Sequence, residues 1–103
     1  MARYAITFDL DTETLKTTYR NDSYNNAYTD IRKILEDFGF EWQQGSVYFS
    51  GEGVSPVSCV VAVQAISAEH DWFKPSVRDI RMLRIEEEND LMPALNPTNR
   101  RRR

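Results

Sequence analysis

Large apolar residues alternate with small or acidic ones along residues 4–11, YAITFDLD. A period of two predicts a β-strand, with the apolar set facing a core and the other set facing away from it. That second set begins with Ala5 and Thr7 and ends in two carboxylates, Asp9 and Asp11. The strand can therefore present acidic chemistry at the end of a sheet.

Two helices are predicted further along the chain. Apolar residues recur at helical spacing from 24 to 38, with Ser23 as the expected N-cap and Gly39 placed to end the helix in a left-handed turn. A second, buried helix is expected over 57–68. It begins with a serine–proline pair, although its valines would also suit a strand.

The remaining segments complete an alternating order of elements. Residues 12–23 are polar and predict a loop, and residues 70–75 predict a turn with an aromatic anchor. A hairpin is expected from a strand at 40–43, a Gln44–Gly45 turn and a strand at 46–49. The last strand, 76–86, does not alternate cleanly, which indicates either a bulge or two partly buried faces.

The order strand, helix, strand, strand, helix, strand predicts an α+β fold of ferredoxin-like βαββαβ type. We expect a four-stranded antiparallel sheet with two helices on one face. Its other face would stay open for a partner or a ligand. The domain is predicted to span residues 1–95, followed by a flexible basic tail at 96–103.

Composition and charge narrow the class of protein. The chain has 103 residues, 41% of them hydrophobic, which fits one domain with a core. Its only cysteine excludes an internal disulfide, and no run is apolar enough to be a signal peptide or a membrane span. A cytoplasmic protein is expected.

The net charge of −3 is unevenly distributed. The last four residues are all arginine, and without them nine basic residues face 16 acidic ones. An acidic body does not favour tight nonspecific binding to nucleic acid. The arginine end is able to contact phosphate, but a plain disordered terminus is the more frequent explanation of such a run.

Several catalytic classes are excluded by residue counts. The single histidine rules out a two-histidine ribonuclease within one chain. The single cysteine argues against a zinc site built from cysteine ligands. No glycine-rich phosphate loop or nucleophile elbow is present. Carboxylates and arginines remain: Asp9 and Asp79, with Arg78, Arg81 and Arg84 in the last strand. The plainer alternatives are a loop anchor for Asp9 and solvated ion pairs for the arginines.

Three motifs carry a resemblance to a known family. They are YAITFDLD at 4–11, WQQGSVYF at 42–49 and SVRDIRMLRIEEENDLMPAL at 76–95. Together they resemble the virulence-associated protein D (VapD) family, which is similar to the small CRISPR-associated ferredoxin-like nucleases. The resemblance covers residues 3–95.

The resemblance implies a homodimeric endoribonuclease that cleaves single-stranded RNA, including messenger RNA. Some members are toxins of toxin–antitoxin pairs, so a cognate antitoxin is a further expected partner. The essential aspartate of the family matches Asp9, and Leu10, Ser46 and Asp79 match other positions associated with activity. No metal is carried over from the resemblance, and Mg²⁺ held by Asp9 is an open alternative.

These residues suggest a division of roles. Asp9 is the expected general base for a ribose 2′-hydroxyl or for water, and Ser46 is the expected donor to a phosphate oxygen. Arg78, Arg81 or Arg84 is the expected counter-charge to the scissile phosphate. In a dimer built on the open faces, Ala5 and Thr7 would allow close approach. The alternative is a dimeric ferredoxin-like module that binds RNA or protein without cleaving it.

Overall fold

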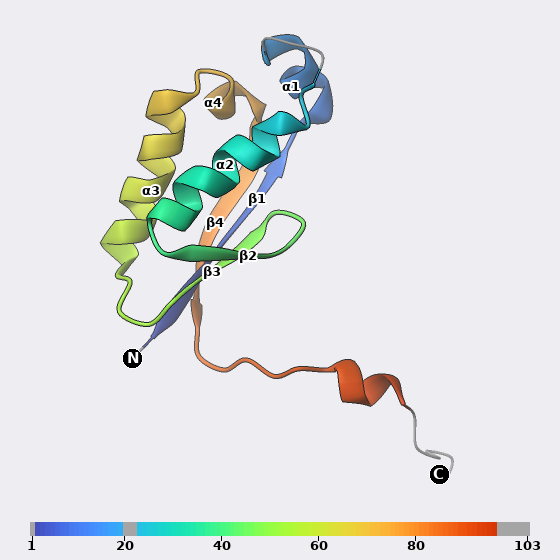
Figure 1. Ribbon diagram of the computed structural model, residues 1–103, viewed down its shortest axis with the longest axis vertical. Coiled ribbons are helices and arrows are strands. Elements are labelled where there is room, and N and C mark those ends of the chain that lie inside the picture. Colours follow the sequence, from blue (N-terminus) through green and yellow to red (C-terminus); the bar gives the residue numbers. More distant parts are fainter. Residues whose placement is uncertain (1, 20–22, 97–103) are drawn as a thin grey trace.

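The computed structural model describes residues 2–19 and 23–96. Its elements are β1 (Arg3–Leu10), α1 (Thr12–Thr18), α2 (Asn26–Asp37), β2 (Phe40–Gln44), β3 (Val47–Ser50), α3 (Pro56–Glu69), α4 (Phe73–Ser76), β4 (Val77–Ile85) and the 3₁₀ helix η1 (Met92–Leu95) (Figure 1). Within these residues the predicted strands and both long helices are present.

The four strands form one antiparallel sheet in the order β2-β3-β1-β4. This is the order expected when two βαβ-like halves interleave, so the ferredoxin-like prediction is confirmed. Strand β1 lies in the middle of the sheet, and β4 is an edge strand beside it. The first and last strands of the chain are therefore neighbours.

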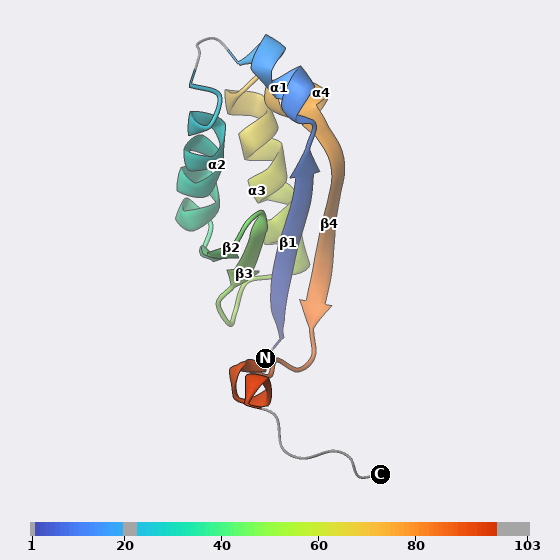
Figure 2. The ribbon, with the colours of Figure 1, turned by 90° about the vertical axis from the view of Figure 1, so that its right-hand side faces the viewer.

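Helices α2 and α3 cover one face of the sheet, and the opposite face is open (Figure 2). The alternation along β1 explains the division. Ile6, Phe8 and Leu10 are buried beneath the helices, whereas Thr7 is half-buried and Asp9 is exposed on the open side. Ala5 also lies on the open side, but it is only 3% exposed because Phe49 and Leu83 flank it on the neighbouring strands.

Two short helices occupy segments that were predicted as a loop and a turn. Helix α1 has four threonines in seven residues, a composition with poor helix propensity. Its side chains compensate, because Leu15 is fully buried and the Thr18 hydroxyl donates to the Thr14 carbonyl at 2.8 Å. Tertiary packing thus overrides the local composition. Helix α4 follows Trp72, and the aromatic anchor predicted there is confirmed by the burial of Trp72 and Phe73.

The boundaries of the long helices differ in detail from the expectation. Helix α2 has Asn25 as its N-cap residue instead of Ser23, whose carbonyl accepts a hydrogen bond from the Asn26 N–H. Helix α3 starts as predicted, with the Ser55 hydroxyl accepting from the Ser58 N–H. It is buried on one side only: Cys59 is enclosed, whereas valines at 57, 60 and 61 are 69%, 53% and 42% exposed.

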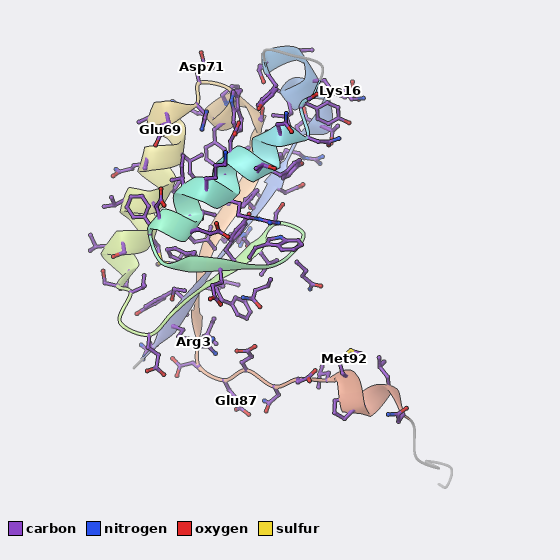
Figure 3. The ribbon with its side chains drawn as sticks, in the orientation of Figure 1. Arg3, Lys16, Glu69, Asp71, Glu87 and Met92 are labelled. Atoms are coloured by element: carbon purple, nitrogen blue, oxygen red, sulfur yellow. The ribbon has the colours of Figure 1, made fainter. Side chains whose placement is uncertain are left out.

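Residues after β4 leave the body of the domain. The chain runs out from the end of β4 and forms η1 away from the sheet and helices (Figures 1 and 3). Leu91, Met92 and Leu95 are 73%, 65% and 70% exposed, so nothing within the described chain covers them. The arginine run predicted as a basic tail lies outside the described residues.

Gly39 provides a test of how the sheet is joined to α2. Its φ is +91°, which side chains other than glycine tolerate poorly, and a Cβ there would meet Val54 at 3.4 Å. Gly39→Ala should therefore lower the free energy of unfolding by about 1–2 kcal/mol in urea titrations. Gly51 has no positive φ and open space around it, so Gly51→Ala is the matched control. Equal costs for the two variants would contradict this reading.

Candidate functional site

Asp9 and Asp79 lie directly opposite each other in the β1–β4 ladder. Opposed residues in an antiparallel pair point to the same face, with Cβ atoms about 5 Å apart. Both carboxylates therefore sit on the open face, near the end of the sheet where α1 and α4 lie (Figure 2). The sequence named both residues but did not predict that they would be neighbours.

A bulge next to this pair accounts for the irregular pattern of the last strand. Leu10 pairs with Val77 while Asp9 pairs with Asp79, so Arg78 is an extra residue in β4. A bulge of this kind redirects the side chain of the inserted residue. The Arg78 Nε lies 3.8 Å from Asp9 Oδ2, and both side chains are 64% exposed.

Asp79 has its own arginine. The Arg81 Nε donates to both carboxylate oxygens of Asp79, at 3.1 and 3.0 Å. This contact raises the pKa of the Arg81 guanidinium, chiefly through the hydrogen bond to Asp79. Arg84 does not join them, because it lies one residue out of phase on β4 and pairs with Glu86 at 2.8 Å.

The β2–β3 hairpin brings a third segment to the same end of the sheet. The Phe8 N–H donates to the Ser46 carbonyl at 3.1 Å, which holds the hairpin tip against β1 immediately before Asp9. The tip turns at Gly45, whose φ is +49°, so the turn falls one residue later than predicted. Ser46 is thus close in space to Asp9 although 37 positions separate them in the sequence.

Leu10 and Asp11 support the site from beneath. Leu10 is 5% exposed and belongs to the core, so it positions the strand end and does not face a substrate. The Asp11 N–H donates to the Ser76 carbonyl at 2.7 Å, and its carboxylate accepts from the Thr14 hydroxyl at 2.5 Å. That hydrogen bond is the main cause of a lowered pKa for Asp11. These contacts make Asp11 an anchor for the start of α1.

Tyr28 is a neighbour of the site that the sequence did not single out. It comes from α2 and is half-buried. Burial raises the pKa of its phenol, and the negative charge of Asp9 adds to that effect. The apolar spacing of α2 predicts Tyr28 only as a core or rim residue. Its electrostatic interaction with Asp9 depends on how α2 packs against the sheet, which the spacing does not give.

Two further properties concern metal ions and membranes. Residues 2–19 and 23–96 contain no group of three or more histidine, cysteine, aspartate or glutamate side chains that could hold a metal ion. In that same part of the chain, no helix combines the length and the apolar run that a bilayer span requires.

Comparison with known proteins places this arrangement in a family. Residues 1–92 match the family model described as CRISPR associated protein Cas2. The chain belongs to this family. Curated relatives agree with one another in name: an endoribonuclease VapD homolog of Helicobacter pylori is 52% identical over 89% of this chain and 95% of its own length. Endoribonuclease VapD 2 of Riemerella anatipestifer is 47% identical over 90% of this chain and 99% of its own.

A third relative extends the agreement. Endoribonuclease VapD of Dichelobacter nodosus is 46% identical over 84% of this chain and 90% of its own length. The resemblance to VapD proteins predicted from the three motifs is therefore confirmed. The matches cover 90% to 99% of the length of these three relatives.

The Asp11 contact predicts a pH-dependent contribution to stability. Since the folded pKa is lowered, the contribution is present above the unfolded value of about 3.9 and is lost as the pH falls through the folded value. Wild type and Asp11→Asn should thus differ most in unfolding free energy near pH 7 and converge toward pH 3, in urea titrations at low salt. Asp37→Asn, at the exposed end of α2, is the control. A difference that persists unchanged at pH 3 would contradict the assignment.

Proposed function

We propose that this protein is an endoribonuclease of single-stranded RNA whose reaction centre is the Asp9 end of the open sheet face. The observation that carries the proposal is the β1–β4 register, which sets Asp9 opposite Asp79 and brings Arg78 to Asp9 through a bulge. The names of the curated relatives supply the reaction class.

Asp9 is suited to the role of general base. Its carboxylate is exposed and is held at a strand end by the buried residues on either side of it, Phe8 and Leu10. It accepts the proton of a ribose 2′-hydroxyl, whose oxygen then attacks the adjacent phosphorus. The bond from phosphorus to the 5′-oxygen breaks, and that oxygen takes a proton from water, whose hydroxide is neutralised by the proton on Asp9. A 2′,3′-cyclic phosphate remains. Attack by a water molecule is the alternative, and it would not require the 2′-hydroxyl.

The arginines supply positive charge where the phosphate becomes more negative. The Asp9–Arg78 pair is solvent-exposed and separated by 3.8 Å, so it is weak. Arg78 is therefore free to move to a phosphate oxygen, where a charged hydrogen bond is stronger. Arg81 is held more tightly by Asp79 and serves mainly to fix that carboxylate beside Asp9.

Mg²⁺ fits the donor types at this site. The ion commonly takes one or two protein carboxylates and completes its shell with phosphate oxygens and water, so Asp9 and Asp79 would be its ligands. Bound there, it would supply an activated water molecule. The chelator arm of the experiment below decides between this route and the metal-free one.

The proposal includes a homodimer, with two open faces packed together. Thr7, Asp9 and Asp79 would lie at the contact, whereas the space over Ala5 is already filled by Phe49 and Leu83. Close approach is therefore proposed at Thr7 instead of Ala5. A toxin role with an antitoxin partner, and a cytoplasmic location that suits the free thiol of Cys59, complete the proposal.

Asp9→Asn should reduce RNA cleavage by at least about 100-fold, because amide oxygen is a poor proton acceptor. The assay uses labelled single-stranded RNA, the same strand with 2′-deoxy residues, and both with and without EDTA. Asp37→Asn is the matched control for loss of an exposed carboxylate. Cleavage that survives in Asp9→Asn would exclude this site, and a wild-type protein that binds but does not cut would support the non-catalytic binding module.

Arg78 and Arg84 form a second matched pair on one strand. Arg78→Gln should lower kcat about tenfold or more, because charge on the phosphate in the transition state loses its counter-ion. Arg84→Gln removes the same charge from the opposite face of β4 and should leave kcat within about twofold. The two variants are compared with the wild type by their rates of RNA cleavage under single-turnover conditions. Equal losses for both variants would show that the effect is general electrostatic attraction of RNA.

A further inference from the structure

An aromatic side chain with an open surface lies on the edge strand β2. Trp42 is 44% exposed, whereas every other aromatic side chain in the part of the chain that the structure describes is half-buried or buried. Single exposed apolar side chains are common on soluble proteins. The contacts around Trp42 therefore decide whether its ring is arranged to bind something.

The indole ring is held in place by two contacts. The Arg32 guanidinium from α2 lies over the ring, 4.2 Å from its centre, which is a cation–π contact. The Trp42 Nε1–H donates to the Gly45 carbonyl at 2.8 Å, across the hairpin tip. Figures 1 and 2 show the β2–β3 hairpin beside α2. Because the ring is already oriented, a group that packs against it loses little affinity to the ordering of the protein.

The guanidinium of Arg32 is held by a second ring. Tyr48 is the direct partner of Trp42 in the β2–β3 ladder, so both side chains lie on the helix-covered face. Burial raises the pKa of the Tyr48 phenol, and an interaction with Arg32 partly offsets that rise. Arg32 thus covers one face of the Trp42 indole, and the exposed surface of that ring is available to a second flat group.

The local charge favours a flat, neutral group over a phosphate. Glu36 lies one helical turn from Arg32, and its negative charge also acts on Tyr48. It therefore offsets the Arg32 charge at this place. A nucleobase fits these conditions, because every base presents a π-face and stacks on an aromatic side chain whatever the sequence. Unpaired RNA bases in particular stack on aromatic rings and on guanidinium planes.

The hairpin tip connects this ring with the proposed reaction centre. Gly45, which accepts the Trp42 hydrogen bond, is followed by Ser46. The Ser46 carbonyl accepts from the Phe8 N–H, and Phe8 is followed by Asp9. An RNA strand that contacts Ser46 therefore lies next to Asp9 on one side and next to the Trp42 hydrogen bond on the other.

The separation fits a short stretch of RNA. Tyr48 pairs with Trp42 on one side and with Ile6 on the other, so two strand spacings, about 10 Å, separate Trp42 from β1. Asp9 lies about 10 Å beyond Ile6 along the strand. The Cα atoms of Trp42 and Asp9 are thus about 14 Å apart. Proteins that bind single strands contact several successive nucleotides over such distances.

The path between the two places is marked by Tyr28. Burial raises the pKa of its phenol, and the negative charge of Asp9 adds to that effect. Tyr28 is also one helical turn before Arg32 on α2. The pairing of β1 with β3 ends at Thr7 and Val47, so β1 continues beyond the hairpin toward Asp9. A strand of RNA can therefore pass from Asp9 around the hairpin tip to the Arg32 side of α2.

We propose that the Trp42 indole, backed by Arg32, is a stacking platform for one nucleobase of the single-stranded RNA, a few nucleotides from the scissile phosphate. The platform rests on the proposed function and adds a substrate contact outside the acidic centre. It also gives a physical source for single-strand preference, because a base in a duplex is already stacked and paired.

Binding of an uncleavable RNA by an inactive protein tests the platform without relying on catalysis. The probe is a fluorescein-labelled single-stranded 2′-O-methyl oligonucleotide, and every variant carries Asp9→Asn. Trp42→Phe keeps an aromatic ring and Trp42→Leu keeps only apolar bulk, while both lose the hydrogen bond to Gly45. Trp42→Leu should bind at least about fivefold more weakly than Trp42→Phe in fluorescence anisotropy. Equal dissociation constants would overturn the inference.

Intrinsic fluorescence follows the unaltered ring and covers the case in which Trp42→Leu does not fold. The chain has two tryptophans, and the other one, Trp72, is only 5% exposed. In a Trp72→Phe background, emission from Trp42 should fall when the oligonucleotide saturates the protein, because a stacked base contacts the indole directly. An abasic strand of the same length keeps the phosphates and should leave the emission unchanged. Equal quenching by the two strands would overturn the inference.

Failure of the platform is distinguishable from failure of the proposed function. Binding that depends on the Trp42 ring, together with no RNA cleavage by the wild type, would uphold the platform and reject the ribonuclease. In the active enzyme the platform predicts a KM at least about fivefold higher for Trp42→Leu than for Trp42→Phe, with the same kcat, because stacking is present before and during the reaction. RNA cleavage with equal KM values for the two variants would reject the platform alone.

Discussion

The first strand of the chain pairs with the last one, and this pairing fixes where the site residues lie. Because β1 and β4 run antiparallel with Asp9 opposite Asp79, residues 70 positions apart in sequence share one end of the open face. The bulge at Arg78 then lets Val77 enter the core beside Leu10 while the arginine reaches Asp9. Without that extra residue, one of the two requirements would fail: either the core would receive an arginine or Asp9 would lose its cation.

Much of this architecture follows from local patterns. Alternation along β1, helical spacing in α2, the Ser55–Pro56 start of α3 and the glycine after α2 each have a direct physical reading, and the order of elements then limits the topology. Helix α1 was not predicted, because its threonines have low helix propensity. Burial of Leu15 stabilises the helix, and burial depends on tertiary packing. The exposure of the α3 valines was not predicted, because hydrophobicity alone does not show which side of a helix packs against the rest of the protein.

The candidate site was predictable as a set of residues but not as an arrangement. Asp9, Ser46, Arg78, Asp79 and Arg81 were all named from the sequence, and all come together. Their mutual contacts depend on register and on a bulge, which a single sequence leaves open. The site is also nearly balanced in charge on an otherwise acidic body, which suits a nuclease that holds RNA locally and does not depend on broad electrostatic attraction.

Mapping a bound, uncleavable RNA onto the protein tests directly whether Asp9 and its neighbours form the reaction centre. Amide chemical shifts would be followed by nuclear magnetic resonance during titration with a 2′-O-methyl oligonucleotide, which lacks the free hydroxyl needed for cleavage. We expect the largest shifts on the open face around Asp9, at residues 7–10, 45–47 and 77–81. Shifts concentrated on the outer surfaces of α2 and α3, with residues 7–10 unaffected, would contradict it.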